Sequence, residues 1–310
     1  MKHSARPPTL PGQLHHALAA LTLYLQDRQV DSPRLSAEVL LAKAMGLKRE
    51  GLLKGLLMNP EEEIGEERLC LAQDYAVRRA KGEPVAYILG TKEFYGRDFK
   101  VTPSTLIPRP ETELLVDLAL NYARRPQSAA CGLFADFGTG SGCIAVTLAL
   151  ELPAWRGIAL EIEDDALAVA RHNAKRYETA NLACVHGDFT RPPLADQSLD
   201  LLVSNPPYVS EAEYEGLDRE VRSFEPKSAL VPGASGAKRP KGAARPDSSP
   251  APGTGLEDAL AIIALAEPLL KPGGRFFMEI GYTQGGPLLA ALAKGNWTKA
   301  SVRKDHAGLN

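Results

Sequence analysis

Apolar side chains near the start of the chain recur at helical spacing. The first set comprises Leu14, Leu18, Leu21 and Leu25. Steps of three or four residues place such side chains on one face, which predicts an amphipathic helix. Ser32-Pro33 predicts a second helix, because serine suits the N-cap and proline the first helical position, and Gly46 suits its end.

A third helix is predicted after Asn59-Pro60, where a cap residue and a proline are followed by three glutamates. This helix can run to about Lys81, and its acidic start suits the positive end of a helix dipole better than a metal site. The segment shows no cluster of catalytic side chains. We therefore interpret residues 1–84 as a small α-helical domain that docks a substrate; the alternative is a bundle that only packs.

The pattern changes to short β-like pieces rich in Tyr and Phe after residue 84. Tyr95-Gly96-Arg97-Asp98 suits a hairpin turn, so we interpret residues 85–108 as a β-hairpin connector. Arg109-Pro110 then leads into another helix, because proline suits a first turn. Two interpretations of Arg109 stay open: it faces a catalytic cleft, or it only pairs with an acid.

Strand-like and helix-like segments alternate after Gly132. The strand-like segments are Leu133–Phe137, Gly157–Leu160, Leu182–Val185 and Leu199–Val203, and helices are expected from Cys143 and from Asp164-Asp165. Near-continuous apolar strands that alternate with helices are typical of a parallel sheet covered on both faces. We therefore expect an α/β domain over residues 109–310.

The first of these strands runs into a glycine-rich loop, Gly138-Thr139-Gly140-Ser141-Gly142. Glycines let a backbone turn sharply and let a ligand approach the exposed N–H groups of the following helix. The dinucleotide pattern G-x-G-x-x-G would need glycine at position 143, where this chain has cysteine. A nicotinamide or flavin site is therefore disfavoured.

Acidic residues follow the next two strands. Glu161 stands where an acid would accept hydrogen bonds from the hydroxyls of a ribose. Asp188 could accept from an adenine amino group, with the ring of Phe189 against the base. Each acid could instead be a helix cap. Because the carboxyl ends of parallel strands form the usual ligand side of such a sheet, the joint placement favours a binding site.

The segment Asn205-Pro206-Pro207-Tyr208 follows the fourth strand. Proline has no N–H, so this stiff segment presents mainly acceptors, which suit the two protons of a substrate NH₂ group. The ring of Tyr208 can pack against the planar group. The alternative interpretation is a Pro-Pro turn that only closes the strand.

Composition narrows the class of protein. The 310 residues are 44% hydrophobic and 24% charged, which indicates a globular chain long enough for two domains. A net charge of −2 argues against a general basic surface for nucleic acid. The four cysteines lack C-x-x-C spacing, so no metal site and no disulfide framework are expected. The absence of a long apolar segment predicts a cytoplasmic protein with no membrane partner.

Several motifs together resemble class I S-adenosylmethionine-dependent methyltransferases. They are Asp136–Gly142, Glu161, Asp188 and Asn205-Pro206-Pro207-Tyr208. A narrower resemblance, to the HemK-type release-factor glutamine N5-methyltransferases, covers nearly the whole chain. It rests on Ile88–Gly96, Leu106–Glu113, Glu225-Pro226, Leu270–Gly274 and Glu279–Gly281. The resemblance implies a Rossmann-like, mostly parallel sheet with helices on both faces and a small N-terminal helical domain.

The resemblance also implies an activity and a site. It implies methylation of the glutamine in the Gly-Gly-Gln motif of class 1 peptide-chain release factors, with S-adenosylmethionine as donor and S-adenosylhomocysteine as product. The cofactor residues would be Asp136, Gly138, Thr139, Gly140, Ser141, Gly142, Glu161, Asp188, Phe189 and Asn205. The substrate glutamine would be held by Asn205, Pro206, Pro207, Tyr208 and Arg109, of which Asn205, Pro206 and Tyr208 are the catalytic candidates.

Two other functions stay open at the level of sequence. The acceptor segment, Asn205-Pro206-Pro207-Tyr208, could hold the exocyclic amine of a flipped adenine. The protein would then be an adenine-N6 methyltransferase of nucleic acid. A non-catalytic release-factor- or ribosome-binding protein is the other alternative. We expect a monomer with no stable nucleic-acid binding. The low-complexity residues 233–255 are expected to be a disordered insert, and the last edge strand is expected to be short or missing.

Overall fold

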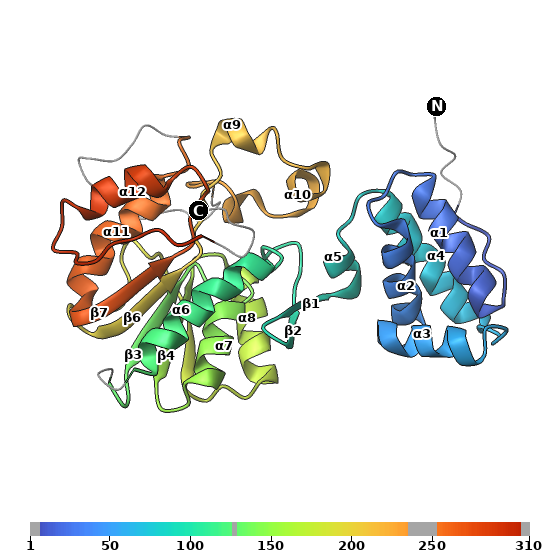
Figure 1. The fold of residues 1–310 in the computed structure, drawn as a ribbon, viewed down its shortest axis with the longest axis horizontal. Helices are drawn as coiled ribbons and strands as arrows, with labels where there is room; N and C mark the ends of the chain where they lie inside the picture. The colour runs from blue at the N-terminus through green and yellow to red at the C-terminus, as the bar shows by residue number, and fades with distance from the viewer. Residues whose placement is uncertain (1–6, 126–128, 235–252, 305–310) are drawn as a thin grey trace. The chain divides into compact units, whose positions relative to one another are not determined.

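The chain divides into two compact units, Met1–Gly90 and Thr91–Asn310. The computed structural model describes residues 7–125, 129–234 and 253–304 (Figure 1). None of the helices within these ranges is long and apolar enough to cross a lipid bilayer.

The first unit is helical. Its helices are α1 (Leu14–Gln26), α2 (Pro33–Ala44), α3 (Arg49–Met58), α4 (Glu66–Ala80) and α5 (Val85–Leu89). The four leucines that predicted α1 are all buried, in one core cluster with residues of α2 and α4. The predicted start of α2 is also confirmed, with Ser32 at the N-cap position, although its side chain makes no capping hydrogen bond.

The predicted start of the third helix is wrong. The helix was expected from Pro60, but α4 begins at Glu66. The intervening backbone bonds instead to the start of α1, where Leu14 N–H donates to the Glu62 carbonyl over 2.9 Å. Tertiary hydrogen bonds therefore outweigh the local helix signal. The end of α4 agrees with the prediction, with Lys81 at the C-cap.

Two helices of this unit were not predicted. Helix α3 contains Gly51 and Gly55, which have low helix propensity and weaken its signal in the sequence. Residues 85–89 were expected to be β-like but form α5, which Gly90 ends with a positive φ of 73°. The pattern of a short apolar run cannot distinguish a strand from a helix.

The second unit opens with the predicted hairpin. Strands β1 (Thr91–Phe94) and β2 (Arg97–Lys100) pair antiparallel. The turn is tighter than the four-residue segment expected, because only Tyr95 and Gly96 connect the strands. Both have positive φ, 53° and 72°, as a two-residue type I′ turn requires.

The predicted parallel sheet is confirmed. Its strands are β3 (Leu133–Phe137), β4 (Arg156–Glu161), β5 (Leu182–His186), β6 (Leu199–Ser204) and β7 (Leu270–Met278). Their order is β5-β4-β3-β6-β7, and every neighbouring pair is parallel. Figure 1 shows β4, β3, β6 and β7 side by side in this order. The chain moves outward from β3 to β5 and then returns to β6 beside β3. Ligands bind at such a switch point in open parallel sheets.

Strand β7 had not been assigned from the sequence. Its register shifts by several residues around Lys-Pro-Gly-Gly, between the pairs Leu199–Leu270 and Leu201–Arg275. The irregular segment hides the strand, because proline and glycine are rare in regular strands. Within residues 7–125, 129–234 and 253–304 no strand follows β7. Strand β7 forms one edge of the described sheet, and β5 forms the other.

Helices cover both faces of the sheet. The long ones are α6 (Glu113–Ala123), α7 (Cys143–Glu151), α8 (Asp164–Arg176), α11 (Glu257–Leu269) and α12 (Gly285–Leu292). Neighbouring strand residues enter different cores: Phe134 packs in one cluster with residues of α6 and α7, and Ala135 in another with residues of α11. This alternation is what a strand buried on both faces produces.

Shorter helices lie between β6 and α11. They are α9 (Glu211–Tyr214), α10 (Arg219–Phe224) and the 3₁₀ turn η2 (Lys227–Ala229); a second 3₁₀ turn, η1 (Pro110–Thr112), precedes α6. Most of the expected disordered insert, residues 233–255, lies outside the described residues.

Candidate active site

A pocket lies at the carboxyl ends of β3, β4, β5 and β6. Most of the residues predicted for the site line it: Arg109, Gly138, Thr139, Gly140, Ser141, Glu161, Asp188, Phe189, Asn205 and Pro207. Asp136, Gly142, Pro206 and Tyr208 were also predicted but are not among the lining residues. All four lie within two residues of a lining residue in the sequence.

The glycine-rich loop Gly138–Gly142, called the glycine cradle below, leaves open space beside its backbone. Gly138 and Gly140 have positive φ, 72° and 56°, and a Cβ added at either position would meet no atom within 4 Å. Side chains there would both strain the backbone and fill the pocket. Gly142 serves a different purpose, because a Cβ there would lie 3.2 Å from Ala170 of α8. The third glycine therefore allows the loop to approach α8 closely.

Asp136 holds the glycine-rich loop through a hydrogen bond from Thr139. Its side chain is fully buried, and the Thr139 hydroxyl donates to Oδ2 over 2.6 Å. Burial raises the pKa of the Asp136 carboxyl to about 7, although the hydrogen bond from Thr139 opposes this change. Asp136 therefore shapes the loop and titrates near neutral pH.

We expect Asp136 to make stability depend on pH. Its pKa rises from 3.8 to about 7 on folding, so its stabilising contribution is present below about pH 4 and is lost as the pH rises through about 7. Asp136→Asn cannot titrate and keeps an acceptor for Thr139. Relative to wild type, its free energy of unfolding should increase by up to about 4 kcal/mol between about pH 4 and 8. Urea titrations of both proteins measure this difference, and a pH-independent difference would contradict the assignment.

Glu161 is held by backbone donors. Its Oε2 accepts from Gly140 N–H over 2.8 Å, and its Oε1 accepts from the N–H groups of Ile162 and Glu163 over 2.9 and 3.1 Å. Burial raises the pKa of the Glu161 carboxyl, and these three donors oppose the rise. A carboxylate has about four acceptor positions, so an acceptor position remains for a ligand hydroxyl.

Asp188 and Phe189 form another part of the pocket wall. Asp188 Oδ1 accepts from Thr190 N–H over 2.8 Å, while its Oδ2 is buried and has no hydrogen-bond partner in the described part of the chain. The Phe189 ring stacks on Phe137, with 6.5 Å between the ring centres and 20° between the planes. An unpaired acceptor beside a supported ring fits a planar base that carries an amino group.

Hydrogen bonds hold Ser204 at the end of β6 and Asn205 at the start of the acceptor segment. The Ser204 hydroxyl donates to the Phe137 carbonyl over 2.7 Å, and Asn205 Nδ2 donates to Thr112 Oγ1 over 3.2 Å. The Tyr208 hydroxyl faces Glu279, with 3.4 Å between Tyr208 Oη and Glu279 Oε1. Burial raises the pKa of Tyr208, so its hydroxyl stays protonated at neutral pH. The Asn205 carboxamide therefore borders the pocket with its NH₂ group already engaged.

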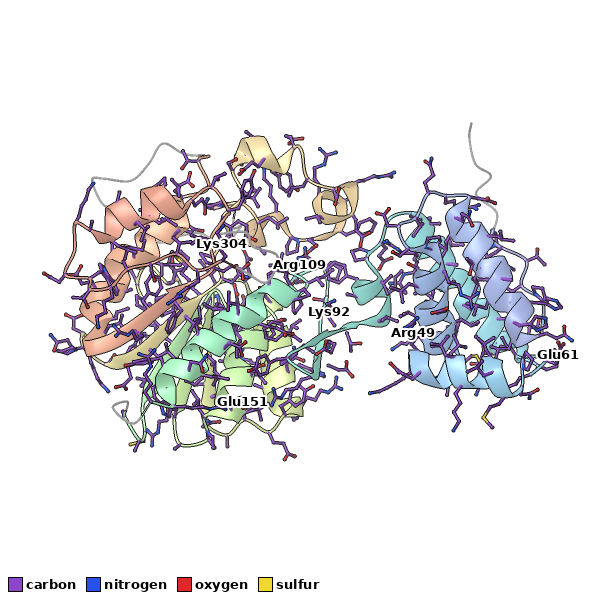
Figure 2. The ribbon with its side chains drawn as sticks, viewed as in Figure 1. Arg49, Glu61, Lys92, Arg109, Glu151 and Lys304 are labelled. Atoms are coloured by element: carbon purple, nitrogen blue, oxygen red, sulfur yellow. The ribbon has the colours of Figure 1, made fainter. Side chains whose placement is uncertain are left out.

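Arg109 both lines the pocket and pairs with an acid, so pairing is not its only contact. It lines the pocket near the start of α6 (Figure 2) and forms an ion pair with Glu225, whose side chain is 1% exposed. Glu225 also accepts from Ile107 N–H over 3.1 Å. The guanidinium is thus held at the pocket wall by a buried carboxylate.

Several supporting residues were not singled out for a role from the sequence. Gln284 Nε2 donates to the Tyr208 carbonyl over 2.9 Å and to the Gly255 carbonyl over 3.1 Å, which ties down the acceptor segment. Thr112 and Glu279 contact the same segment. Glu279 follows β7, so the strand-end rule that identified the other acids would have identified it if β7 had been recognised.

Metal binding finds no geometric support in the described residues. No group of three or more His, Cys, Asp or Glu side chains among them could hold a metal ion. The pocket instead combines an open glycine cradle, two acids at strand ends and a wall of acceptors. These features fit a nucleoside-containing cofactor beside a substrate that presents an NH₂ group.

Comparisons with known proteins identify relatives over nearly the whole chain. Residues 16–90 match the family model of the PrmC N-terminal domain, and residues 115–220 match that of the methyltransferase small domain. A protein from Nitratidesulfovibrio vulgaris named release factor glutamine methyltransferase is 47% identical, covering 97% of this chain and 93% of the relative. Proteins of the same name from Geobacter sulfurreducens and Koribacter versatilis are 38% and 36% identical, covering 93% and 96% of this chain and 90% and 95% of the relatives.

Proposed function

Because the chain belongs to the release factor glutamine methyltransferase family, we propose that it methylates the glutamine of the Gly-Gly-Gln motif in class 1 peptide-chain release factors. The methyl group goes from S-adenosylmethionine to the side-chain amide nitrogen, N5. The observation that carries this proposal is the Asn205 carboxamide, held at the edge of a pocket that also contains the glycine cradle. The protein would act as a monomer in the cytoplasm, where release factors work.

The residues of the cradle and strand ends suit the cofactor. Gly138–Gly142 would receive its amino-acid portion, Glu161 a ribose hydroxyl, and Asp188 with Phe189 its adenine. The open space at Gly138 and the unpaired Asp188 Oδ2 support this assignment. When bound, S-adenosylmethionine supplies a methyl group that is electrophilic because it is attached to a sulfonium.

The acceptor segment addresses the weak nucleophilicity of an amide. The lone pair of the glutamine nitrogen is delocalised into its carbonyl, so the nitrogen must be oriented. Asn205 Oδ1 and the Pro206 carbonyl would accept its two N–H groups and direct the lone pair into the pocket. Proximity and orientation of this kind contribute about 7–11 kcal/mol in well-aligned reactions. The same acceptor dipoles stabilise positive charge as it develops on the nitrogen.

Glu161→Ala should weaken cofactor binding without changing the choice of substrate. A lost charge-assisted hydrogen bond costs about 1.5–3 kcal/mol, or roughly 10- to 150-fold in the dissociation constant. Glu161→Asp is the matched control, since it keeps the charge on a side chain one methylene shorter, and it should bind more tightly than Glu161→Ala. Calorimetric titration with S-adenosylmethionine measures both. An unchanged dissociation constant for Glu161→Ala would assign this residue to structure only.

The alternatives receive no support from the reported relatives, all of which are named for glutamine methylation of release factors. Transfer of a radiolabelled methyl group separates the possibilities. We expect label on a purified class 1 release factor and none on duplex DNA or on RNA. A release factor whose motif glutamine is replaced by glutamate should remain unlabelled. Label on nucleic acid, or on neither substrate, would contradict the proposal.

A further inference from the structure

Thr112 and Glu279 form a chain of hydrogen bonds behind Asn205. The Thr112 hydroxyl donates to Glu279 Oε2 over 2.7 Å, and Asn205 Nδ2 donates to Thr112 Oγ1 over 3.2 Å. Thr112 is buried at the end of η1, and Glu279 follows β7. The N–H of Glu279 also donates to the Ser204 carbonyl over 3.0 Å, which ties the end of β7 to the residue before Asn205.

The number of protons in this series of hydrogen bonds determines which way the Asn205 carboxamide points. A threonine hydroxyl has one proton, and Thr112 donates it to Glu279. A Glu279 carboxylate in its ionised form can only accept. Thr112 Oγ1 is left as an acceptor, so only the NH₂ side of Asn205 can bond to it. A flipped carboxamide would place Oδ1 against the lone pairs of Oγ1 and the negative charge of Glu279. In the observed orientation, no donor from the described residues reaches Asn205 Oδ1.

We propose that Thr112 and Glu279 are positioning residues that keep the oxygen of the Asn205 carboxamide available to the substrate amide. The inference rests on the proposed function and deepens it. An exposed acceptor binds the N–H groups of glutamine, whereas a flipped carboxamide would present donors, which suit the carboxylate of glutamate. The pair therefore contributes to selection of glutamine as well as to turnover.

The negative charge of ionised Glu279 favours the observed orientation of the Asn205 carboxamide over the flipped one. A protonated carboxyl could donate to Thr112, whose hydroxyl could then donate to Asn205 Oδ1 and stabilise the flipped state. Burial raises the pKa of Glu279, and the hydrogen bonds from Thr112, Asn205 and Tyr208 oppose the rise. The titratable groups that face Glu279 are Tyr208, Glu111 and Cys143. Turnover should therefore fall as the pH decreases through the raised pKa of Glu279.

The Thr112 hydroxyl provides a matched pair of variants. Thr112→Val keeps the shape of the side chain but removes the hydroxyl, and it should lower kcat at least about tenfold with KM for release factor changed less than about twofold. Thr112→Ser keeps the hydroxyl and should retain most of kcat. Glu279→Gln should lower kcat and abolish the decline at acid pH, because an amide does not titrate. Equal kcat in the valine and serine variants, or an acid decline that persists in Glu279→Gln, would overturn the proposal.

A measurement without turnover separates this inference from the proposed function. In protein labelled with ¹⁵N-asparagine, the side-chain NH₂ signal of Asn205 is assigned by its loss in Asn205→Ala. We expect slow proton exchange of this NH₂ group in wild type and Thr112→Ser, and exchange at least about tenfold faster in Thr112→Val. Equal exchange in all three proteins would overturn the positioning role. Protected exchange in a wild-type protein that fails to label release factor would refute the proposed function alone.

Discussion

Asn205→Ala is expected to lower turnover at least about a hundredfold, as is typical when one preorganised polar group at a transition state is lost. The variant removes the Oδ1 acceptor and the Nδ2 bond to Thr112, but it leaves the glycine cradle and Glu161 in place. The dissociation constant for S-adenosylmethionine should therefore stay nearly unchanged. Steady-state methylation of release factor and calorimetric titration of the cofactor measure the two quantities.

An asparagine outside the pocket provides the control for this variant. Asn296 lies after α12 and donates to Glu267, so Asn296→Ala removes a carboxamide that has no part in the pocket. Its turnover should match wild type. The melting temperatures of Asn205→Ala and Asn296→Ala should be alike. Turnover of Asn205→Ala within threefold of wild type would then contradict the proposed role of Asn205.

Removal of residues 1–90 is expected to abolish most methylation of intact release factor while leaving cofactor binding largely unchanged. The second unit has hydrophobic core clusters of its own and the whole lining of the pocket. The first unit, as a docking domain, would supply most of the contact with the protein substrate. A single glutamine in a pocket offers too little contact to offset the entropy lost on protein association.

A short peptide that contains Gly-Gly-Gln is the control for this truncation. Because it is too small to contact a docking domain, the full chain and the fragment should methylate it at similar, slow rates. If the helical unit only stabilises the sheet unit, the fragment should lose its thermal transition and its cofactor binding together. A folded fragment that methylates intact release factor at the wild-type rate would refute the docking role.

The sequence predicts the parts of the site that follow from strand position. Glu161, Asp188 and Asn205 all line the pocket because the carboxyl ends of parallel strands meet at one edge of the sheet. Each follows a mainly apolar run that is recognisable as a strand. Glu279 occupies the same kind of position, but the proline and glycines within β7 hide that strand.

Contacts between distant segments are beyond what a local pattern indicates. The Thr112–Glu279 hydrogen bond joins residues 167 positions apart, and the Arg109–Glu225 ion pair joins residues 116 apart. A contact with a distant segment also explains why the predicted start of α4 is wrong. Asn59-Pro60 and the glutamates are a strong local signal, yet the backbone of Glu62 is used by the start of α1. Local propensity decides an element only where no tertiary contact competes for its backbone.

The proposed function requires the methyl group to reach the side-chain nitrogen of one glutamine. Fragmentation mass spectrometry of a class 1 release factor, incubated with the protein and S-adenosylmethionine carrying a deuterated methyl group, locates that methyl group directly. The proposed function predicts one labelled methyl group per release factor, on the side-chain amide of the Gly-Gly-Gln glutamine. A labelled methyl group on another residue, or a release factor that stays unlabelled while the cofactor binds, would contradict it.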